Sequence, residues 1–330
     1  MYRSKIAGIG KNVPEKIITN FDLEKMMDTS NEWIIERTGI HERRFVTQPC
    51  GCAELALPAC EQAITDAGIE KTDIELIIVA TTTPEHQFPG TSSFLQAQLD
   101  LKGVPTLDIR VQCSGFVYGL SIADQFIKTG QYQYILLVGA EIQSVGLDLT
   151  TEGRDIAVLF GDGAGAAIIS RSDNDSEILS THLFGDGKHA MDLSIDAPVG
   201  YECPRISKEM IDEGRQFPQM NGRQVFKHAV TRFPEAVRAA LKANNWSIED
   251  VDMVVPHQAN MRITEAIAKR LGLPLEKVFS NIHKYGNTTA ASIPLALAEA
   301  CEEQKIQRGD KVVLAAFGSG FTWASAAIVW

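Results

Sequence analysis

The 330-residue chain has no apolar run approaching the roughly 18 residues that a membrane-spanning helix needs. Its first residues, Met-Tyr-Arg-Ser-Lys-Ile, do not resemble a secretory signal. Positive charge is scarce, because 31 Lys and Arg face 42 Asp and Glu, which gives a net charge of −11. The six cysteines form no regular framework of disulfide spacings. We therefore expect a cytoplasmic protein with reduced thiols that binds neither nucleic acid nor membrane.

The cysteines also lack the spacing of a metal site. Cys50 and Cys52, with Cys60 and His41, are the residues closest to a zinc-binding set, but their spacing does not match a standard ligand pattern. We predict no metal and no bound cofactor.

What the chain does contain is an internal duplication. The segment 72–79 resembles 249–256, and 134–138 resembles 311–315, both at an offset of 177 residues. A repeat of this kind indicates two copies of one structural unit.

Short apolar strands alternate with stretches that have the apolar period of helices. This order is typical of α/β proteins, in which sheets lie between helical layers. Two such halves predict a pseudo-symmetric arrangement of five layers. We place the halves at 1–172 and 173–330, with an insertion at about 186–221 that carries loops of the site. The predicted helices include 53–67, 226–241 and 260–271.

Three polar residues lie at predicted strand-to-helix junctions. Cys113 follows a short strand, and the unpaired N–H groups of a helix start favour the reactive thiolate. His257 follows the second copy of a buried strand, and Asn287 begins another helix after Gly286. Alone, each has an ordinary explanation: a core cysteine, a hydrogen-bonded core histidine or a helix N-cap. Together they predict a buried site for nucleophilic catalysis where the two halves meet.

A different class of function is a nucleotide-binding oxidoreductase, because the segment 161–165 reads Gly-Asp-Gly-Ala-Gly. In a dinucleotide-binding fold these glycines join a strand to a helix. Here they precede a predicted strand, so the motif lacks the context that it needs.

Six segments, taken in order, resemble β-ketoacyl-acyl-carrier-protein synthase III, a condensing enzyme of the thiolase superfamily. The resemblance covers the chain from end to end. It implies the thiolase-like α/β fold, with duplicated βαβαβαββ halves in five layers α-β-α-β-α, and a homodimer. The segments are Glu32–Arg44, Cys113-Ser-Gly-Phe, Phe160-Gly-Asp-Gly-Ala-Gly-Ala, Val255-Pro-His-Gln-Ala-Asn, Gly286-Asn-Thr-Thr-Ala-Ala-Ser and Ala316-Phe-Gly-Ser-Gly-Phe-Thr-Trp.

The resemblance implies a decarboxylative condensation of an acyl-CoA with malonyl-acyl-carrier protein. Cys113 would be the nucleophile that carries the acyl group, with His257 and Asn287 as its catalytic partners. The backbone N–H groups of Cys113 and Ser319 would stabilise the oxyanion. The resemblance also implies further contacts: Trp33, Arg37, Arg154 and Gly222 with coenzyme A, Phe88 and Phe317 with the acyl chain, and Lys227, Arg262 and Lys269 with the carrier protein.

The starter acyl group and the acceptor stay open at this point. A related acyltransferase, or a head-to-head condensing enzyme of secondary metabolism, would use the same cysteine with other substrates. The insertion at 186–221 is rich in apolar side chains. Either the insertion forms a flap that stabilises a dimer, or it lines a pocket for acyl chains longer than acetyl.

Overall fold

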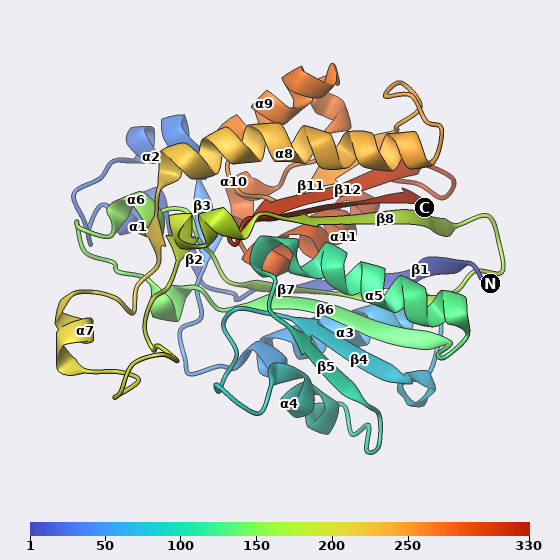
Figure 1. Cartoon of the computed structure of the whole chain (residues 1–330), viewed down its shortest axis with the longest axis horizontal. Coiled ribbons are helices and arrows are strands. Elements are labelled where there is room, and N and C mark those ends of the chain that lie inside the picture. Colours follow the sequence, from blue (N-terminus) through green and yellow to red (C-terminus); the bar gives the residue numbers. More distant parts are fainter.

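The computed structural model describes residues 1–330 and contains two mixed sheets between three helical layers (Figure 1). In the first sheet β4 runs parallel to β5 and β6, while β7 pairs antiparallel with β6 and β1. The fully buried sequence Leu-Ile-Ile-Val-Ala of β4 is typical of a strand covered on both faces. The strand order is β1 (Ser4–Asn12), β7 (Gly163–Arg171), β6 (Tyr134–Glu141), β4 (Leu76–Ala80) and β5 (Thr106–Ile109).

The second sheet has four strands. Its first pair is parallel and the other two pairs are antiparallel. Their order is β11 (Met253–Pro256), β12 (Lys311–Gly318), β13 (Thr322–Val329) and β8 (Glu177–Gly185).

Helices α5 (Gly115–Thr129) and α11 (Ser292–Glu302) lie between the two sheets (Figure 1). Apolar side chains around them, such as Phe116 and Leu297, belong to the largest buried cluster. The outer face of the first sheet is covered by α3 (Cys52–Ala67) and α4 (Thr91–Gln98). That of the second is covered by α8 (Gly222–Ala243), against which α9 (Met261–Leu271) packs. The predicted five layers are confirmed.

The duplication is also visible in three dimensions. The offset of 177 residues relates the starts of β4 and β11, of β6 and β12, and of α5 and α11. The halves differ at one strand, because the second half has no counterpart of β5. There the chain makes only a single bridge, between Val254 and Val278, and then forms α10 (Ile282–Tyr285). The expected βαβαβαββ order is therefore complete in the first half, and the second half follows it except for this one strand.

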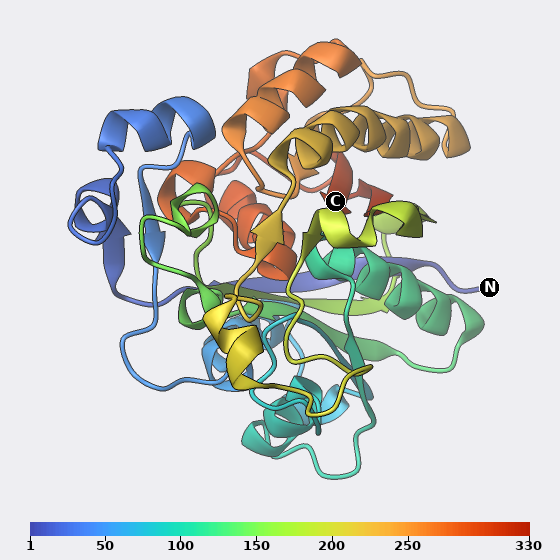
Figure 2. The ribbon, with the colours of Figure 1, turned by 60° about the vertical axis from the view of Figure 1, so that its left-hand side comes forward.

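The insertion adds a two-stranded ribbon and one short helix beside the layers (Figures 1 and 2). The ribbon pairs β9 (Leu193–Ser194) with β10 (Gln219–Met220), and α7 (Lys208–Asp212) lies in the loop between them.

No helix in the structure is long and apolar enough to span a membrane. The other elements are α1 (Asn20–Leu23), α2 (Asn31–Thr38), α6 (Arg154–Ala157), β2 (Ile17–Thr19), β3 (Glu42–Arg44) and the 3₁₀ helices η1 (Lys71–Asp73), η2 (Gln112–Ser114), η3 (Ser144–Gly146), η4 (Gly187–Asp192), η5 (Leu275–Lys277) and η6 (Thr289–Ala291).

Candidate active site

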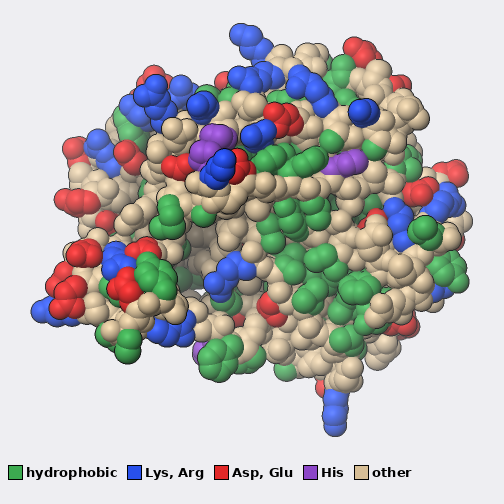
Figure 3. Space-filling model, viewed as in Figure 1, with side chains coloured by type: hydrophobic (Ala, Val, Ile, Leu, Met, Phe, Trp, Pro, Cys, Tyr) green, Lys and Arg blue, Asp and Glu red, His purple; other side chains and the backbone are tan.

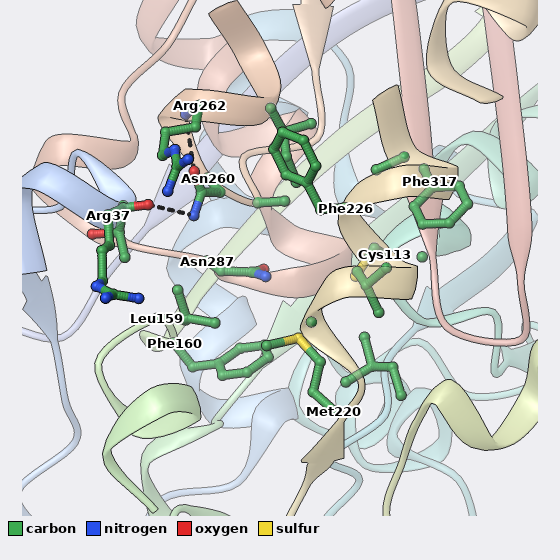
Figure 4. Close-up of a pocket in the computed structure, with 18 of the residues that line it drawn as sticks. Arg37, Cys113, Leu159, Phe160, Met220, Phe226, Asn260, Arg262, Asn287 and Phe317 are labelled. Atoms are coloured by element: carbon green, nitrogen blue, oxygen red, sulfur yellow. Dashed lines mark hydrogen bonds between the residues drawn. The ribbon is translucent and has the colours of Figure 1, made fainter. Parts of the chain in front are cut away.

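A cavity of about 420 Å³ opens where the two halves meet, at the carboxyl ends of β11 and of the strand that precedes Cys113. It brings together Cys113, His257 and Asn287, which lie far apart in the sequence (Figure 4). The remaining predicted residues that line it are Trp33, Arg37, Gly222, Arg262 and Phe317.

Cys113 lies in η2, immediately before α5, and is 6% exposed. The end of β12 passes directly over it. A Cβ added at Gly318 would come within 2.7 Å of the Cys113 Cβ and 3.2 Å of its Sγ, so a side chain at that position would displace the cysteine. Gly318 therefore allows the Ser319 backbone to approach the sulfur.

The pKa of the Cys113 thiol is raised to about 12, mainly by burial and then by the charge of Glu141. Hydrogen bonds from the backbone N–H groups of Cys113 and Ser319 lower it, but they do not offset the burial. The expectation that the helix start stabilises the thiolate is thus wrong for the free protein. Burial destabilises the thiolate by more than the hydrogen bonds from the nearby N–H groups stabilise it. The Cys113 side chain is therefore a thiol in the free protein.

Glu141, at the end of β6, is a buried carboxylate that the sequence did not single out. Burial raises its pKa to about 7, although several hydroxyl and backbone groups hydrogen-bond it. Thr82 donates to it from its backbone N–H at 3.1 Å and from its hydroxyl at 2.9 Å, and Thr83 donates from its hydroxyl at 2.7 Å. Glu141 therefore holds the loop after β4 in place behind the cysteine.

Asn287 is held rigidly by its backbone and by its side-chain oxygen. Its N–H donates to the Leu159 carbonyl at 2.8 Å, and its own carbonyl accepts from Gly161 at 3.0 Å. Its Oδ1 accepts the backbone N–H of Thr289 at 2.9 Å. This assigns Nδ2 as the free end of the amide, and Figure 4 shows the side chain extending toward Cys113.

The turns that carry Cys113 and Asn287 are equivalent in the duplication. Gln112 and Thr289 occupy the same position in the two halves, and both have a left-handed backbone, with φ of 42° and 50°. Non-glycine residues with positive φ are uncommon and concentrate where surrounding structure enforces them. The two turns also touch, since a Cβ at Gly115 would meet the Ala290 Cβ at 3.4 Å. The helix starts that follow Cys113 and Asn287 therefore come together where the two halves meet.

His257 directly follows β11 and is 2% exposed. Burial lowers its pKa to about 3, and the Thr289 carbonyl offsets this only in part. The imidazole is therefore neutral at physiological pH. Its Nδ1 lies 2.6 Å from the Ser292 Oγ, whereas its Nε2 is buried without a hydrogen-bond partner.

Trp33 and its basic neighbours lie at the mouth of the cavity, away from the sulfur. The guanidinium of Arg37 lies 4.6 Å from the centre of the Trp33 ring, and that of Arg154 lies 5.4 Å from it. Asn260 connects this group to α9, because its Nδ2 donates to the Arg37 carbonyl at 3.0 Å (Figure 4). An indole flanked by two guanidinium groups is a suitable platform for a flat aromatic ligand.

The insertion contributes to the cavity through its ribbon alone. Leu193 and Met220 line the cavity, and the Ser319 hydroxyl donates to the Leu193 carbonyl, which ties the ribbon to the segment over Cys113. Val199 and Met210 are buried in a separate small cluster. The large hydrophobic side chains of the insertion that remain exposed are Met191, Ile195, Tyr201, Ile206 and Ile211.

Five of the predicted residues do not line the cavity, and one of them, Ser319, reaches the Cys113 sulfur through its backbone N–H. Phe88 is 82% exposed, so within one chain it contacts no acyl site, and its predicted role requires a second copy. Lys227 and Lys269 are exposed on α8 and α9, outside the cavity. Arg154 reaches the site only through Trp33.

Several residues of the site were not identified from the sequence. Gly318 and Glu141 act through close packing and burial, and Ser292 through a single hydrogen bond. None belongs to a pattern with a recognisable spacing, although Ser292 ends a segment, Gly286–Ser292, that the resemblance did include.

Comparison with known proteins identifies the family. The family model "3-Oxoacyl-[acyl-carrier-protein (ACP)] synthase III" matches residues 107–187, and the model of its C-terminal part matches residues 241–330. The β-ketoacyl-[acyl-carrier-protein] synthase III of Clostridioides difficile strain 630 is 46% identical over 328 residues, which cover 99% of this chain and 98% of the relative. The chain belongs to the β-ketoacyl-acyl-carrier-protein synthase III family. It is therefore an acyltransferase of the condensing type.

Solved structures support the same assignment. The synthase III structure from Aquifex aeolicus has a TM-score of 0.90 at 43% identity and covers 99% of this chain and 100% of its own. A priming β-ketosynthase from the R1128 polyketide pathway has the same TM-score, 0.90, at only 28% identity and covers 99% of this chain and 96% of its own. The full-length relatives named β-ketoacyl-[acyl-carrier-protein] synthase III agree with a role in starting fatty acid biosynthesis.

Proposed function

We propose that the protein condenses an acyl-CoA with a malonyl thioester on acyl carrier protein, through an acyl group bound to Cys113. The observation that carries this proposal is the convergence of a buried thiol, a neutral imidazole and a free amide on one cavity. A related acyltransferase with other substrates would use the same cysteine but is not favoured by any feature of the cavity.

In the first half-reaction the Cys113 sulfur attacks the acyl-CoA carbonyl. The N–H groups of Cys113 and Ser319, which already face the sulfur, stabilise the tetrahedral oxyanion. The intermediate then expels coenzyme A, which leaves as a thiol with the proton that Cys113 has lost. Because this proton passes to the leaving group, the raised pKa of the resting thiol does not prevent acylation.

In the second half-reaction the malonyl thioester loses CO2, and the electron pair of the broken C–C bond forms an enolate. The Nε2–H of neutral His257 and the Nδ2–H of Asn287 donate hydrogen bonds to the enolate oxygen. No base is needed, since decarboxylation itself generates the carbanion. The carbanion attacks the acyl-Cys113 carbonyl and displaces the Cys113 thiolate as the β-ketoacyl thioester forms. The thiolate then takes up a proton from solvent, which regenerates the resting thiol.

The substrates that we propose fit the two ends of the cavity. Trp33 would stack on the adenine of coenzyme A with the Arg37 and Arg154 guanidinium groups beside it. The acyl chain would lie against Phe317 and the ribbon residues Leu193 and Met220. In a homodimer, the exposed Phe88 of a second copy would complete this wall.

Mass spectrometry of the intact protein tests the two half-reactions separately. Incubation with acyl-CoAs from acetyl to dodecanoyl is expected to add one acyl group, and malonyl-acyl-carrier protein is then expected to remove it as a β-ketoacyl product. An acyl mass that malonyl-acyl-carrier protein never discharges would contradict the condensation.

The same panel tests the wall of the acyl site. Met220→Ala enlarges the cavity and is expected to shift acylation toward longer chains, by about fourfold for each added methylene that becomes buried, or about 0.8 kcal/mol. Met191→Ala, at an exposed position of the insertion, is the matched control. An unchanged chain-length profile in Met220→Ala would show that the insertion does not line the acyl site.

The surface of α8 and α9 supports docking of an acidic carrier protein. Lys and Arg side chains gather on the part of the surface that these helices form (Figure 3). The two helices carry eight basic and two acidic residues in a chain whose net charge is −11. Arg262 lines the cavity, so the patch reaches the mouth through which a carrier-bound substrate would enter.

Charge reversal on this patch, with Lys227→Glu and Lys269→Glu combined, is expected to reduce kcat/KM for malonyl-acyl-carrier protein about tenfold at low salt, with less effect at high salt. Acylation from acyl-CoA is expected to stay near normal, because neither lysine lines the cavity. The control Lys71→Glu with Lys102→Glu makes the same change of charge at exposed positions outside the patch. Equal losses in both half-reactions would argue against docking.

A further inference from the structure

His257 can donate a hydrogen bond to the enolate only in the tautomer that carries its proton on Nε2. A neutral imidazole holds one proton, which can lie on either nitrogen, and the partner of Nδ1 decides between them. That partner is the hydroxyl of Ser292, at 2.6 Å. Ser292 is 2% exposed, so water does not compete for this contact.

The hydrogen bonds around Ser292 determine which way its hydroxyl points. The backbone N–H of Gln258 donates to the Ser292 oxygen at 3.4 Å. The only other partner of that oxygen is the Nδ1 of His257. If Nδ1 carried the proton, the serine oxygen would receive two donors and its own hydrogen would have no acceptor. If Nδ1 is unprotonated, the hydroxyl donates to it and all three groups are satisfied.

Gln258 is itself held in place on both sides of its side-chain amide. Its Nε2 donates to the Pro256 carbonyl at 2.7 Å, and its Oε1 accepts from the Ser280 hydroxyl at 2.8 Å. The backbone N–H that points at Ser292 is therefore part of a buried and rigid segment, which leaves the hydroxyl little freedom to turn away from His257.

We infer that Ser292 is a positioning residue that donates its hydroxyl hydrogen to Nδ1 of His257 and thereby places the imidazole proton on Nε2, facing the cavity. Nε2 has no hydrogen-bond partner within the protein, so a proton placed there is free to be donated to a ligand in the cavity. The inference rests on the proposed function for its consequence in catalysis, but the tautomer itself is a property of the free protein.

The tautomer can be measured directly by ¹⁵N NMR of protein labelled in the imidazole nitrogens. The chain has seven histidines, and comparison with His257→Gln assigns the signals of His257. Because its pKa is about 3, the ring is neutral between pH 6 and 8, so the spectrum there reports the tautomer alone. We expect the wild type to show protonated Nε2 and Ser292→Ala to show a mixture of both tautomers. A wild-type spectrum with protonated Nδ1 would overturn the inference.

Kinetics of the two half-reactions separate positioning from a general loss of structure. In Ser292→Ala we expect condensation to fall roughly tenfold to 100-fold in kcat, while the rate of Cys113 acylation and the KM for the malonyl substrate change little. Ser292→Thr keeps the hydroxyl and is expected to recover most of the loss. Ser325→Ala is the matched control, because it removes another buried hydroxyl, which donates to the Ala236 carbonyl outside the cavity.

The outcomes distinguish this inference from the proposed function. If the wild type has protonated Nε2 but never forms a β-ketoacyl product, the role of Ser292 stands and the proposed function fails. If Ser292→Ala condenses as fast as Ser325→Ala, or loses acylation as well as condensation, Ser292 does not act by positioning His257. Should Ser292→Ala not fold, the wild-type and Ser292→Thr spectra still decide the tautomer.

Discussion

Replacing Cys113 with alanine is expected to abolish the acyl mass that the protein retains from acyl-CoA and to reduce condensation by roughly a millionfold, as for other catalytic nucleophiles. The reason is that the proposed acyl intermediate forms on the Cys113 sulfur, and no other thiol lines the cavity. His257 and Asn287 remain in place, so slow decarboxylation of the malonyl thioester should persist without formation of a new C–C bond. The measurement is intact mass, combined with release of CO2.

Cys203 offers the matched control for this experiment. It is an exposed free cysteine in the insertion, outside the cavity. Cys203→Ala should therefore acylate and condense like the wild type. Retention of an acyl mass by Cys113→Ala, or its loss in Cys203→Ala, would mean that the nucleophile has been assigned to the wrong residue.

Replacing Asn287 with alanine is expected to separate the two half-reactions. Acylation of Cys113 should continue, because its oxyanion is stabilised by the backbone N–H groups of Cys113 and Ser319. Condensation should fall by about 100-fold to 1,000-fold, the usual loss when one donor to a developing oxyanion is removed. Single-turnover kinetics on protein that has been acylated beforehand would measure this step alone.

Asn287→Asp tests whether the loss comes from the donor rather than from the shape of the side chain. The carboxylate is nearly isosteric, but it has no N–H and it carries a negative charge close to the enolate. It should condense no better than Asn287→Ala. If either variant blocks acylation as completely as Cys113→Ala does, the assigned division of roles is incorrect.

The architecture was predictable because it depends on patterns that repeat along the chain. The offset of 177 residues and the alternation of apolar strands with helices led to two halves and five layers. The helix predicted from residue 53 begins at Cys52 and is capped by Gly68 in the left-handed conformation, and α9 ends at Leu271 as expected. The missing counterpart of β5 was not predictable, since no local property of Ile282–Tyr285 prevents a strand there.

The three polar residues that meet in the cavity were predicted from residue type, from position at strand-to-helix junctions and from a resemblance in ordered motifs. The electrostatics of the site were not predicted from the sequence. The position of Cys113 before α5 suggested a stabilised thiolate, whereas burial and Glu141 raise the pKa of its thiol to about 12. Burial depends on every element that packs over the residue, and here β12 from the other half of the chain provides part of that cover.

The sequence by itself determined the family, the fold class and which three polar residues meet, because these follow from periodicity and from motifs that are local in the chain. Only the tertiary structure decided how those residues are held. Ser292 contacts His257, and the charge of Glu141 raises the pKa of the Cys113 thiol, although the members of each pair are distant in sequence. The direction of a hydrogen bond and the free-energy cost of burying a charge depend on atoms that the fold brings together. They therefore cannot be inferred from residues that are adjacent in the sequence.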